Sequence, residues 1–199
     1  MRSALDTSSR TRLFVALELP ESLRTHAAES GAIAATHTQA RLVPAANLHV
    51  TLQFLGHVGA GWVEDLIATL ADAFHGPSIR VLAGLVVPRP SPGRARLLAL
   101  ELHDVDGALT ILAKRIHRAT SAALGAPASN RPLWPHITVA RLSRPQRVRR
   151  SPTTESERVF DITRVALYNS DIAPGRAPRY DELLGATLGT LAQRSPSNG

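Results

Sequence analysis

Two short patterns each occur twice in this chain, in the same order and at nearly the same spacing. Ala16-Leu17-Glu18-Leu19 returns as Ala99-Leu100-Glu101-Leu102, and a His-x-Thr triplet follows each copy, at His49-Val50-Thr51 and at His136-Ile137-Thr138. The step from the opening alanine to the histidine is 33 residues in the first copy (16 to 49) and 37 in the second (99 to 136). The matched order predicts a duplicated strand–helix–strand unit with a pseudo-twofold axis. The period is too long, and the copies are too few, for a solenoid.

Helical periodicity between the two patterns supports the duplication. In the second copy, Asp106 can cap a helix that runs to about Ala123, where Gly125 can end it. The apolar residues of this segment recur at steps of three and four, which is the helical period. The other predicted elements are helices over 21–34 and 62–74, and strands over 79–87 and 159–168.

The composition limits the class of protein. With 199 residues, of which 44% are hydrophobic, the chain is long enough for one globular domain and too apolar for a disordered one. It has no cysteine, which excludes disulfides, a zinc finger and a thiol nucleophile and favours a reducing compartment. The apolar run at 13–19 is short and contains Glu18, so we expect no signal peptide, no membrane span and a cytoplasmic protein. One domain is predicted over 11–193, between disordered ends at 1–10 and 194–199.

Arginine dominates the charged residues. The formal net charge is +7, from 22 Arg, one Lys and 16 acidic residues. A positive field favours anionic partners such as nucleic acid or phosphorylated metabolites, although codon bias in a GC-rich genome explains arginine over lysine equally well. The polar stretch 143–158 is predicted to be a mobile basic loop, and it carries Arg144, Arg147, Arg149 and Arg150.

The His-x-Thr triplets carry the chemistry. Side chains at i and i+2 of a strand point to the same face, so His49 shares a face with Thr51, and His136 with Thr138. Under a twofold axis, both pairs can line one cleft. Neutral imidazole is a base and imidazolium an acid near pH 7, and hydroxyls can donate hydrogen bonds to phosphate oxygens. The set suits in-line displacement at phosphorus, in which one histidine activates the nucleophile and the other protonates the leaving oxygen.

Two plainer interpretations compete with this one. A single His-x-Thr on a strand is usually a surface or hydrogen-bonded histidine, but two triplets in matching places of a duplicated unit weigh against that explanation. A zinc site is disfavoured, because neither triplet has an adjacent carboxylate and no third ligand is evident. We therefore expect neither a metal nor a cofactor.

Three flanking residues are candidates for substrate binding. Arg141 lies five residues after His136, so on a regular strand it faces the opposite way; it is a surface arginine unless the strand bends or ends first. Trp134 lies two residues before His136 and can stack on a base, or equally belong to the core or its rim. Phe14, with Arg12 on the same predicted strand, is expected to approach the cleft.

At these residues the chain resembles the two-histidine (2H) phosphoesterases. The run Asn47-Leu48-His49-Val50-Thr51-Leu52-Gln53-Phe54-Leu55-Gly56 is similar to the first motif of that superfamily. Ser129-Asn130-Arg131-Pro132 through Pro135-His136-Ile137-Thr138-Val139-Ala140-Arg141 is similar to the second. The opening Arg12-Leu13-Phe14-Val15-Ala16-Leu17, and Leu167-Tyr168 with Gly175 and Tyr180, also match the LigT/ThpR branch, the RNA 2′,3′-cyclic phosphodiesterases. The likeness covers about residues 11–185.

The resemblance implies an α+β fold of two pseudo-symmetric lobes, with duplicated halves over about 11–95 and 96–185. Each lobe would line a central cleft with an antiparallel sheet and carry helices outside. The implied reaction is hydrolysis of an RNA 2′,3′-cyclic phosphate to a 2′-phosphomonoester; related proteins also join tRNA halves through a 2′,5′ linkage. His49 would donate a proton to the departing 3′ oxygen and His136 would accept one from water, while Thr51, Thr138 and Arg141 hold the phosphate. The expected partner is RNA with a cyclic phosphate end, such as a tRNA fragment, and the expected state is a monomer.

The chain departs from the family beside its second motif. The family often has an aromatic residue where Leu133 stands, whereas here the aromatic residue is Trp134, so the ring changes face and base stacking is in doubt.

Two other functions stay open at this point. One is a non-catalytic RNA-binding module, which needs only basic charge and stacking. The other is a phosphodiesterase for 2′,5′-oligonucleotides or a cyclic nucleotide. The two histidine motifs are nearly symmetric, so they do not decide which histidine is the acid.

Overall fold

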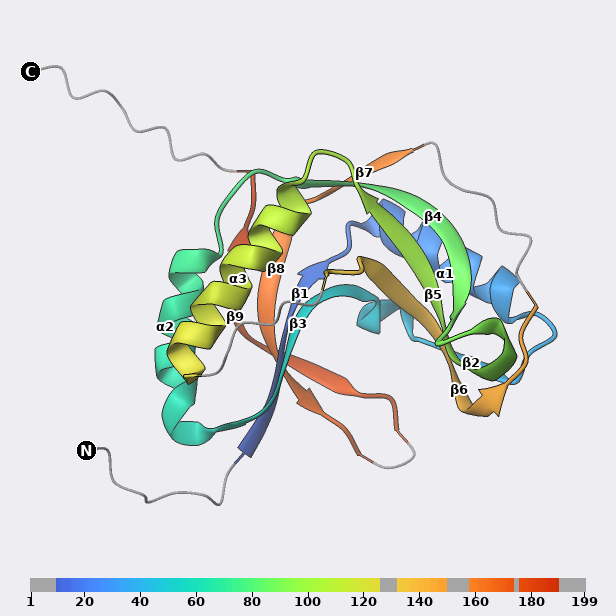
Figure 1. The fold of residues 1–199 in the computed structure, drawn as a ribbon, viewed down its shortest axis with the longest axis horizontal. Coiled ribbons are helices and arrows are strands. Elements are labelled where there is room, and N and C mark those ends of the chain that lie inside the picture. The colour runs from blue at the N-terminus through green and yellow to red at the C-terminus, as the bar shows by residue number, and fades with distance from the viewer. Residues whose placement is uncertain (1–9, 126–131, 150–157, 174–175, 190–199) are drawn as a thin grey trace, which may run out of the picture.

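A computed structural model describes residues 10–125, 132–149, 158–173 and 176–189 (Figure 1). Outside these residues lie positions 1–9 of the predicted disordered end at 1–10, the predicted disordered end at 194–199, positions 129–131 of the second motif, and Gly175. Arg10, which we expected in the disordered extension, begins the first strand instead.

The strands of the described residues form one curled antiparallel sheet. Its spatial order is β7 (Val159–Ile162), β4 (Ile79–Arg89), β5 (Ala95–Asp104), β6 (His136–Gln146), β3 (His49–Gly59), β1 (Arg10–Glu18), β8 (Arg164–Asp171) and β9 (Arg179–Thr187), and β2 (Ala40–Leu42) pairs with β6. At the centre, Val50 of β3 pairs with Ile137 of β6. We call the strands on the two sides of this pair the β6 wing, which includes β2, and the β3 wing.

The strand order is symmetric about the central pair. Moving outward, β6 corresponds to β3, β5 to β1, and β4 to β8. The repeated patterns fall on corresponding strands: alanine-leucine-glutamate lies on β1 and β5, and His-x-Thr on β3 and β6. The predicted α+β fold, with antiparallel strands on both sides of a centre, is confirmed.

Each wing takes strands from both halves of the sequence. β4 belongs to the first half but pairs with β5, and β8 belongs to the second half but pairs with β1. The single strand predicted over 159–168 is two strands, because the chain leaves one wing after β7 and joins the other as β8. The duplicated halves at 11–95 and 96–185 therefore stay a prediction about the repeat, since the wings do not follow that division.

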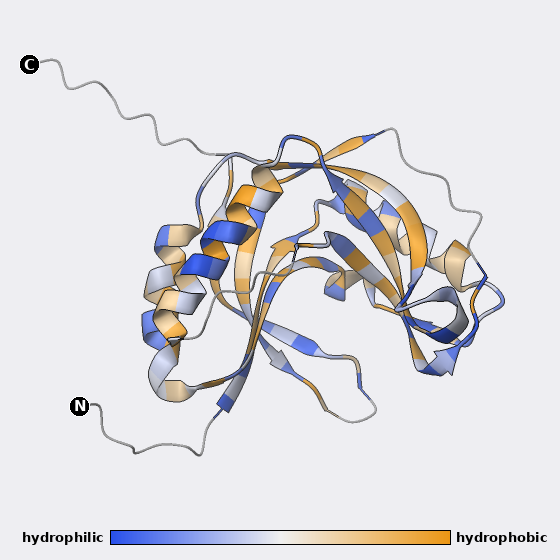
Figure 2. Cartoon of the chain, in the orientation of Figure 1, coloured by the Kyte–Doolittle hydropathy of each residue, from blue (hydrophilic) through white to orange (hydrophobic). Residues whose placement is uncertain are grey.

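Helices cover the outer faces of the wings. α1 (Glu21–Ala35) follows β1 but crosses to pack on β5 and β6, and α3 (Ala108–Leu124) follows β5 but packs on β3 and on α2 (Val63–Ala73). Gly31 allows α1 to approach closely, since a Cβ there would lie 2.8 Å from Val139 Cβ. Figure 2 shows hydrophobic residues along the strands and hydrophilic residues on the outer turns of α3. No helix within the described ranges is long and apolar enough to cross a bilayer.

The start of α3 corrects one sequence expectation. Asp104, not Asp106, provides most of the cap: its carboxylate accepts hydrogen bonds from three backbone N–H groups of the first turn and from the Thr110 hydroxyl. Among the described residues, Asp106 accepts one hydrogen bond, from the backbone N–H of Ala108 at the start of α3. Gly125 ends the helix at φ 61°, in the left-handed conformation that glycine adopts without strain.

The basic stretch that we expected to be a loop begins as strand. β6 continues through Ser143 to Gln146, where Gln146 pairs with Ala95 of β5. Backbone pairing with β5 extends the strand here. The sequence did not predict this, because the side chains show no apolar alternation. Positions 150–157 of the stretch lie outside the described residues.

Candidate active site

The two His-x-Thr triplets meet at the centre of the sheet. His49 and Thr51 of β3, and His136 and Thr138 of β6, line one cavity of about 710 Å³, which we call the central cleft. Val50 pairs with Ile137 between the triplets, and both side chains are buried. The alternation of the two strands therefore sends imidazoles and hydroxyls to the cleft and apolar side chains to the core.

The repeated alanine-leucine-glutamate strands lie directly beside the triplets. The first ladder places Ala16 opposite Thr51 and Glu18 opposite His49. The second ladder repeats these pairs with Ala99, Thr138, Glu101 and His136. Cross-strand neighbours have Cβ atoms only about 4.5–5.5 Å apart, so a small alanine leaves space beside each threonine. The repeat thus builds the same local surface on both sides of the cleft.

Backbone carbonyls orient both imidazole rings in the same way. His49 Nδ1 lies 2.8 Å from the Asn47 carbonyl oxygen, and His136 Nδ1 lies 2.8 Å from the Trp134 carbonyl oxygen. Because a carbonyl only accepts, each Nδ1 carries a hydrogen and donates it, which leaves Nε2 to exchange a proton. His49 Nε2 lies 3.0 Å from Thr51 Oγ1. In both rings, Nε2 is therefore the nitrogen that is not bound to a backbone carbonyl.

The surroundings lower the pKa of both histidines. Burial is the largest cause for His49, and the positive charge of Arg141 and the proximity of His136 add to it, against the Asn47 carbonyl. Burial also dominates for His136; Arg89 and Arg141 lower its pKa further, whereas the Trp134 carbonyl and Glu101 raise it. Both rings are mainly neutral at pH 7, and an anion bound between them would favour the protonated form.

A β-bulge turns Arg141 toward the cleft. The β5–β6 register shifts between Leu98 and Ala99, which pair with Ala140 and Thr138, so β6 has one extra residue there. Val139 and Ala140 are consecutive buried residues, and alternation then resumes with Arg141 on the cleft side. On a regular strand this arginine would face away. The bulge is therefore the bend that Arg141 needs in order to face the same side as His136.

Trp134 contacts His136 and other protein groups. The two rings stack with centroids 3.9 Å apart and planes at 18°. The indole Nε1 donates a hydrogen bond of 3.1 Å to Glu101 Oε1, and the Arg89 guanidinium lies 4.1 Å from the ring centroid. Arg89 also donates to Glu101 Oε1 at 2.8 Å. The indole is thus held against His136, and it does not line the central cleft.

The carboxylate of Glu101 near His136 leads to a testable prediction. Glu101→Gln should lower the pKa of His136 and leave that of His49 unchanged, because a negative charge that favours imidazolium is removed. The measurement is an NMR titration of the histidine ring protons. Glu18→Gln, the corresponding change on β1, is the matched control and should not move His136. A raised His136 pKa in Glu101→Gln would contradict the assignment.

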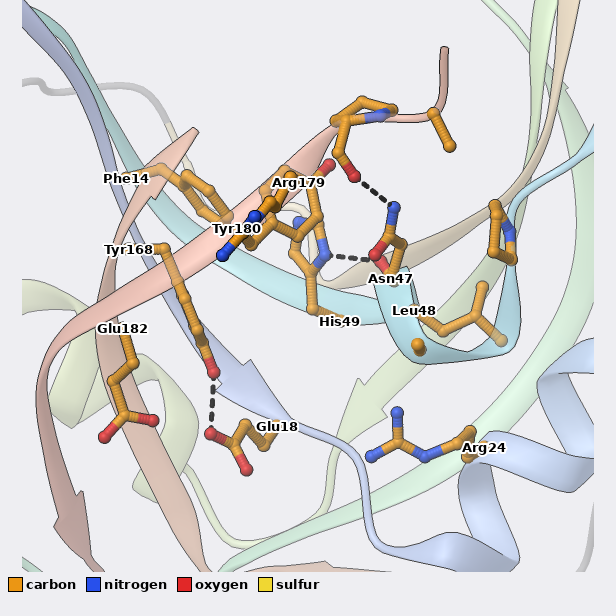
Figure 3. Close-up of a pocket in the computed structure, with 14 residues that line it drawn as sticks. Phe14, Glu18, Arg24, Asn47, Leu48, His49, Tyr168, Arg179, Tyr180 and Glu182 are labelled. Atoms are coloured by element: carbon orange, nitrogen blue, oxygen red, sulfur yellow. Dashed lines mark hydrogen bonds between the residues drawn. The ribbon is translucent and has the colours of Figure 1, made fainter. Parts of the chain in front are cut away.

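Aromatic rings surround His49 on the β3 wing. The Phe14 ring centroid lies 5.1 Å from that of His49, and Tyr180 meets the imidazole edge-on at 5.5 Å and 89°. Figure 3 shows Tyr180 beside His49, and the Tyr168 hydroxyl directed at Glu18. That hydroxyl donates a 2.6 Å hydrogen bond, and burial with this bond raises the pKa of Tyr168. Phe14 lines the cleft, but it is only 3% exposed, so most of its ring surface packs against protein groups such as His49.

Several residues at the site were missed by sequence reasoning. Glu18 and Glu101 belong to the repeat, but their role beside the histidines needed the ladder register. A charge repeated on a buried strand was the available signal. Phe54 lines the cleft with 66% of its surface exposed, which no local pattern indicates. Arg41 and Arg176 also line the cleft, together with the expected Arg12.

The cleft has the character of an anion site. Its guanidinium groups are those of Arg12, Arg41, Arg141 and Arg176. Across the described residues, no three His, Cys, Asp or Glu side chains gather as metal ligands would. Two proton-exchanging Nε2 atoms, two hydroxyls and a converging positive field suit the transfer of a phosphoryl group.

Comparisons with known proteins agree with this geometry. No family model matches the chain. The RNA 2′,3′-cyclic phosphodiesterase of Escherichia coli strain K12 is 32% identical over 179 residues, which cover 88% of this chain and 96% of that protein. The protein TT0787 of Thermus thermophilus superposes with a TM-score of 0.75 and 26% identity, over 88% of this chain and 97% of that one. E. coli LigT complexed with 3′-AMP gives a TM-score of 0.70 and 28% identity, over 92% of this chain and 100% of that one.

Proposed function

The chain belongs to the LigT-like RNA 2′,3′-cyclic phosphodiesterases of the 2H phosphoesterase superfamily, and we propose that it hydrolyses RNA 2′,3′-cyclic phosphate ends to 2′-phosphomonoesters. The observation that carries this proposal is the approach of two imidazole Nε2 atoms and Arg141 to one cleft. Hydrolysis of a cyclic phosphate by this route needs a base and an acid on opposite sides of one phosphorus atom.

The proposed reaction is a single in-line displacement. Water attacks phosphorus while His136 Nε2 accepts its proton, and the bond from phosphorus to O3′ breaks as His49 Nε2 donates a proton to O3′. The product carries a 2′-phosphate and a 3′-hydroxyl. Proton exchange with solvent then returns His136 to its neutral form, and His49 takes up a proton from solvent when the next substrate binds.

The electrostatics support a neutral base at His136. Burial lowers its pKa, so the ring is unprotonated near pH 7 and ready to accept a proton. The acid at His49 needs the substrate, because its own surroundings also lower its pKa. A bound phosphate anion next to the ring favours the imidazolium, which would charge the acid only when substrate is present.

The remaining predicted site residues divide into two groups. Thr51, Thr138 and Arg141 are proposed to hold the phosphate oxygens, since hydroxyls and a guanidinium are donors of the right kind and all line the cleft. Trp134 and Phe14, which we expected to contact substrate, are proposed to position His136 and His49 through their ring contacts.

The proposed setting is a monomer in the cytoplasm that acts on RNA ends such as those of tRNA fragments. One chain supplies every group of the cleft, and a chain without cysteine fits a reducing compartment. An RNA 5′-hydroxyl in place of the attacking water would give a 2′,5′ linkage by the same bond changes, and we include this ligation in the proposal.

Product analysis tests the proposed function. A 12-nucleotide RNA that ends in a 2′,3′-cyclic phosphate should yield a 2′-phosphate end, identified by phosphorus NMR against both authentic monoesters. EDTA should not slow the reaction, because imidazoles supply the acid and the base. A 3′-phosphate product, or inhibition by EDTA that zinc reverses, would contradict the proposal.

A further inference from the structure

Five exposed arginines lie on two neighbouring segments of the β6 wing, and none of them lines the central cleft. They are Arg94, Arg96, Arg144, Arg147 and Arg149, which we call the distal arginine patch. They come from two segments: the turn and strand start at 94–96, and the end of β6 with the residues after it. The basic stretch found in the sequence is one of these segments, and the proposed function gives it no role.

Backbone contacts hold the two segments side by side. Ala95 pairs with Gln146 in the β5–β6 ladder. Beyond the ladder, the Val148 N–H donates a 2.8 Å hydrogen bond to the Pro92 carbonyl. Arg147 and Arg149 flank that bond and line a groove of about 540 Å³ with Pro92 and Val148. These backbone contacts therefore bring together the two segments that carry the arginines.

The charges of the patch are not balanced locally. All five arginines are exposed, and none forms an ion pair with any residue that the structure describes. The sequence at 92–98 and 139–149 contains no Asp or Glu. Two arginines of the β3 wing differ: Arg164 pairs with Glu18 and Glu182, and Arg179 pairs with Asp181. Unpaired like charges gathered by a fold favour an anionic partner.

The patch is continuous with the cleft through β2 and β6. Arg41 of β2 pairs with Arg141 of β6, and both line the central cleft. β6 then runs outward from His136 to Gln146, where the patch begins. In Figure 1, β2 and the end of β6 lie together at one end of the β6 wing. A polymer that has its terminal phosphate in the cleft and leaves it along β6 would meet this positive surface next.

We propose that the distal arginine patch binds the sugar–phosphate backbone of the RNA strand whose cyclic phosphate end occupies the central cleft. The inference rests on the proposed function and adds a second contact surface, which a longer RNA strand can reach and a cyclic mononucleotide cannot. Each nucleotide adds one negative charge, and the guanidinium fork matches phosphate oxygens. The patch would recognise the backbone without regard to sequence, because it offers charge and few groups that read bases.

The test compares a short and a long substrate on one variant. Arg144→Ser, Arg147→Ser and Arg149→Ser are combined, since these side chains lie outside the cleft. Turnover of 2′,3′-cyclic AMP should be unchanged. For the 12-nucleotide cyclic-phosphate RNA, kcat/KM should fall about tenfold, and the slope of log kcat/KM against log salt should weaken by about 2, at roughly 0.7 per lost phosphate contact.

A matched control removes equal charge elsewhere. Arg80→Ser, Lys114→Ser and Arg118→Ser change three exposed cations on β4 and α3. This variant should keep wild-type kcat/KM on both substrates. Equal losses in the two triple variants would show an effect of net charge alone and overturn the proposal. An unchanged rate on the long RNA in the patch variant would also overturn it.

Binding separates this inference from the proposed function. If the wild-type protein turns over neither substrate, the proposed function fails, but anisotropy of a labelled 12-nucleotide RNA still reports on the patch. The patch variant should then bind at least about tenfold more weakly than the control variant. Equal RNA affinity of the two variants, or binding to phosphatidylserine vesicles in place of RNA, would reject the patch as an RNA surface.

Discussion

His49→Ala and His136→Ala should each lower kcat on a cyclic-phosphate RNA by about 10²- to 10⁴-fold, which is the usual contribution of one proton transfer. The two substitutions remove the Nε2 atoms that face the cleft, while the fold keeps its buried Val50–Ile137 centre. The double variant should be little worse than either single one, because the two groups act in the same step.

The pH profile distinguishes the two roles. Wild-type kcat/KM should be bell-shaped, since one imidazole must be neutral and the other protonated. His136→Ala should remove the fall on the acid side, and His49→Ala the fall on the alkaline side. The reverse pattern would exchange the proposed roles. His57→Ala, an exposed histidine further along β3, is the control and should retain full activity. Full activity in either His49→Ala or His136→Ala would reject the two-histidine mechanism.

Arg141→Gln should lower kcat/KM by about 10²- to 10³-fold, as expected for loss of a donor that stabilises charge on a reacting oxygen. The same change should raise the pKa of both histidines, because the positive charge of Arg141 lowers them in the native cleft. Both limbs of the bell should therefore move to higher pH. Steady-state rates across pH, with NMR titration of the ring protons, measure the two effects.

Two variants complete this test. Arg141→Lys keeps the charge but not the guanidinium fork, so its histidine pKa values should stay near wild type while kcat/KM is only partly restored. Arg118→Gln, an exposed change on α3, should alter neither quantity. Wild-type kcat/KM in Arg141→Gln would show that Arg141 does not act on the phosphate. A shift of the bell to lower pH would contradict the effect of its charge on the histidine pKa values.

The bounds of an element, and the face on which each of its side chains lies, were predictable where the local sequence has a clear helical or strand period. The step of three and four predicted α3 to within a residue of its end, and the i, i+2 rule placed His49 with Thr51 on one face. The repeat predicted that two triplets would share a cleft, because a twofold axis brings corresponding strands together. These inferences succeeded because each depends on the backbone geometry of one segment or on the symmetry of two copies.

Contacts between distant segments were not predictable. The bulge beside Val139 depends on how β6 pairs with β5, and it reverses the face of Arg141. The stacking of Trp134 on His136 depends on Glu101 and Arg89, which come from two other strands. The approach of the segment with Arg94 to the segment with Arg147 depends on the β5–β6 ladder and on the hydrogen bond from the Val148 N–H to the Pro92 carbonyl. None of these has a local pattern.

By itself, the sequence determined the repeat, the two His-x-Thr triplets that meet at the cleft, and most helix and strand positions. Tertiary structure alone decided which wing each strand joins, where the ladders slip by one residue, and which side chains support the two imidazoles. The physical reason is that backbone periodicity is a property of neighbours along the chain. Register and side-chain contact depend instead on which distant segments pair, and that pairing is settled only when the whole core is packed.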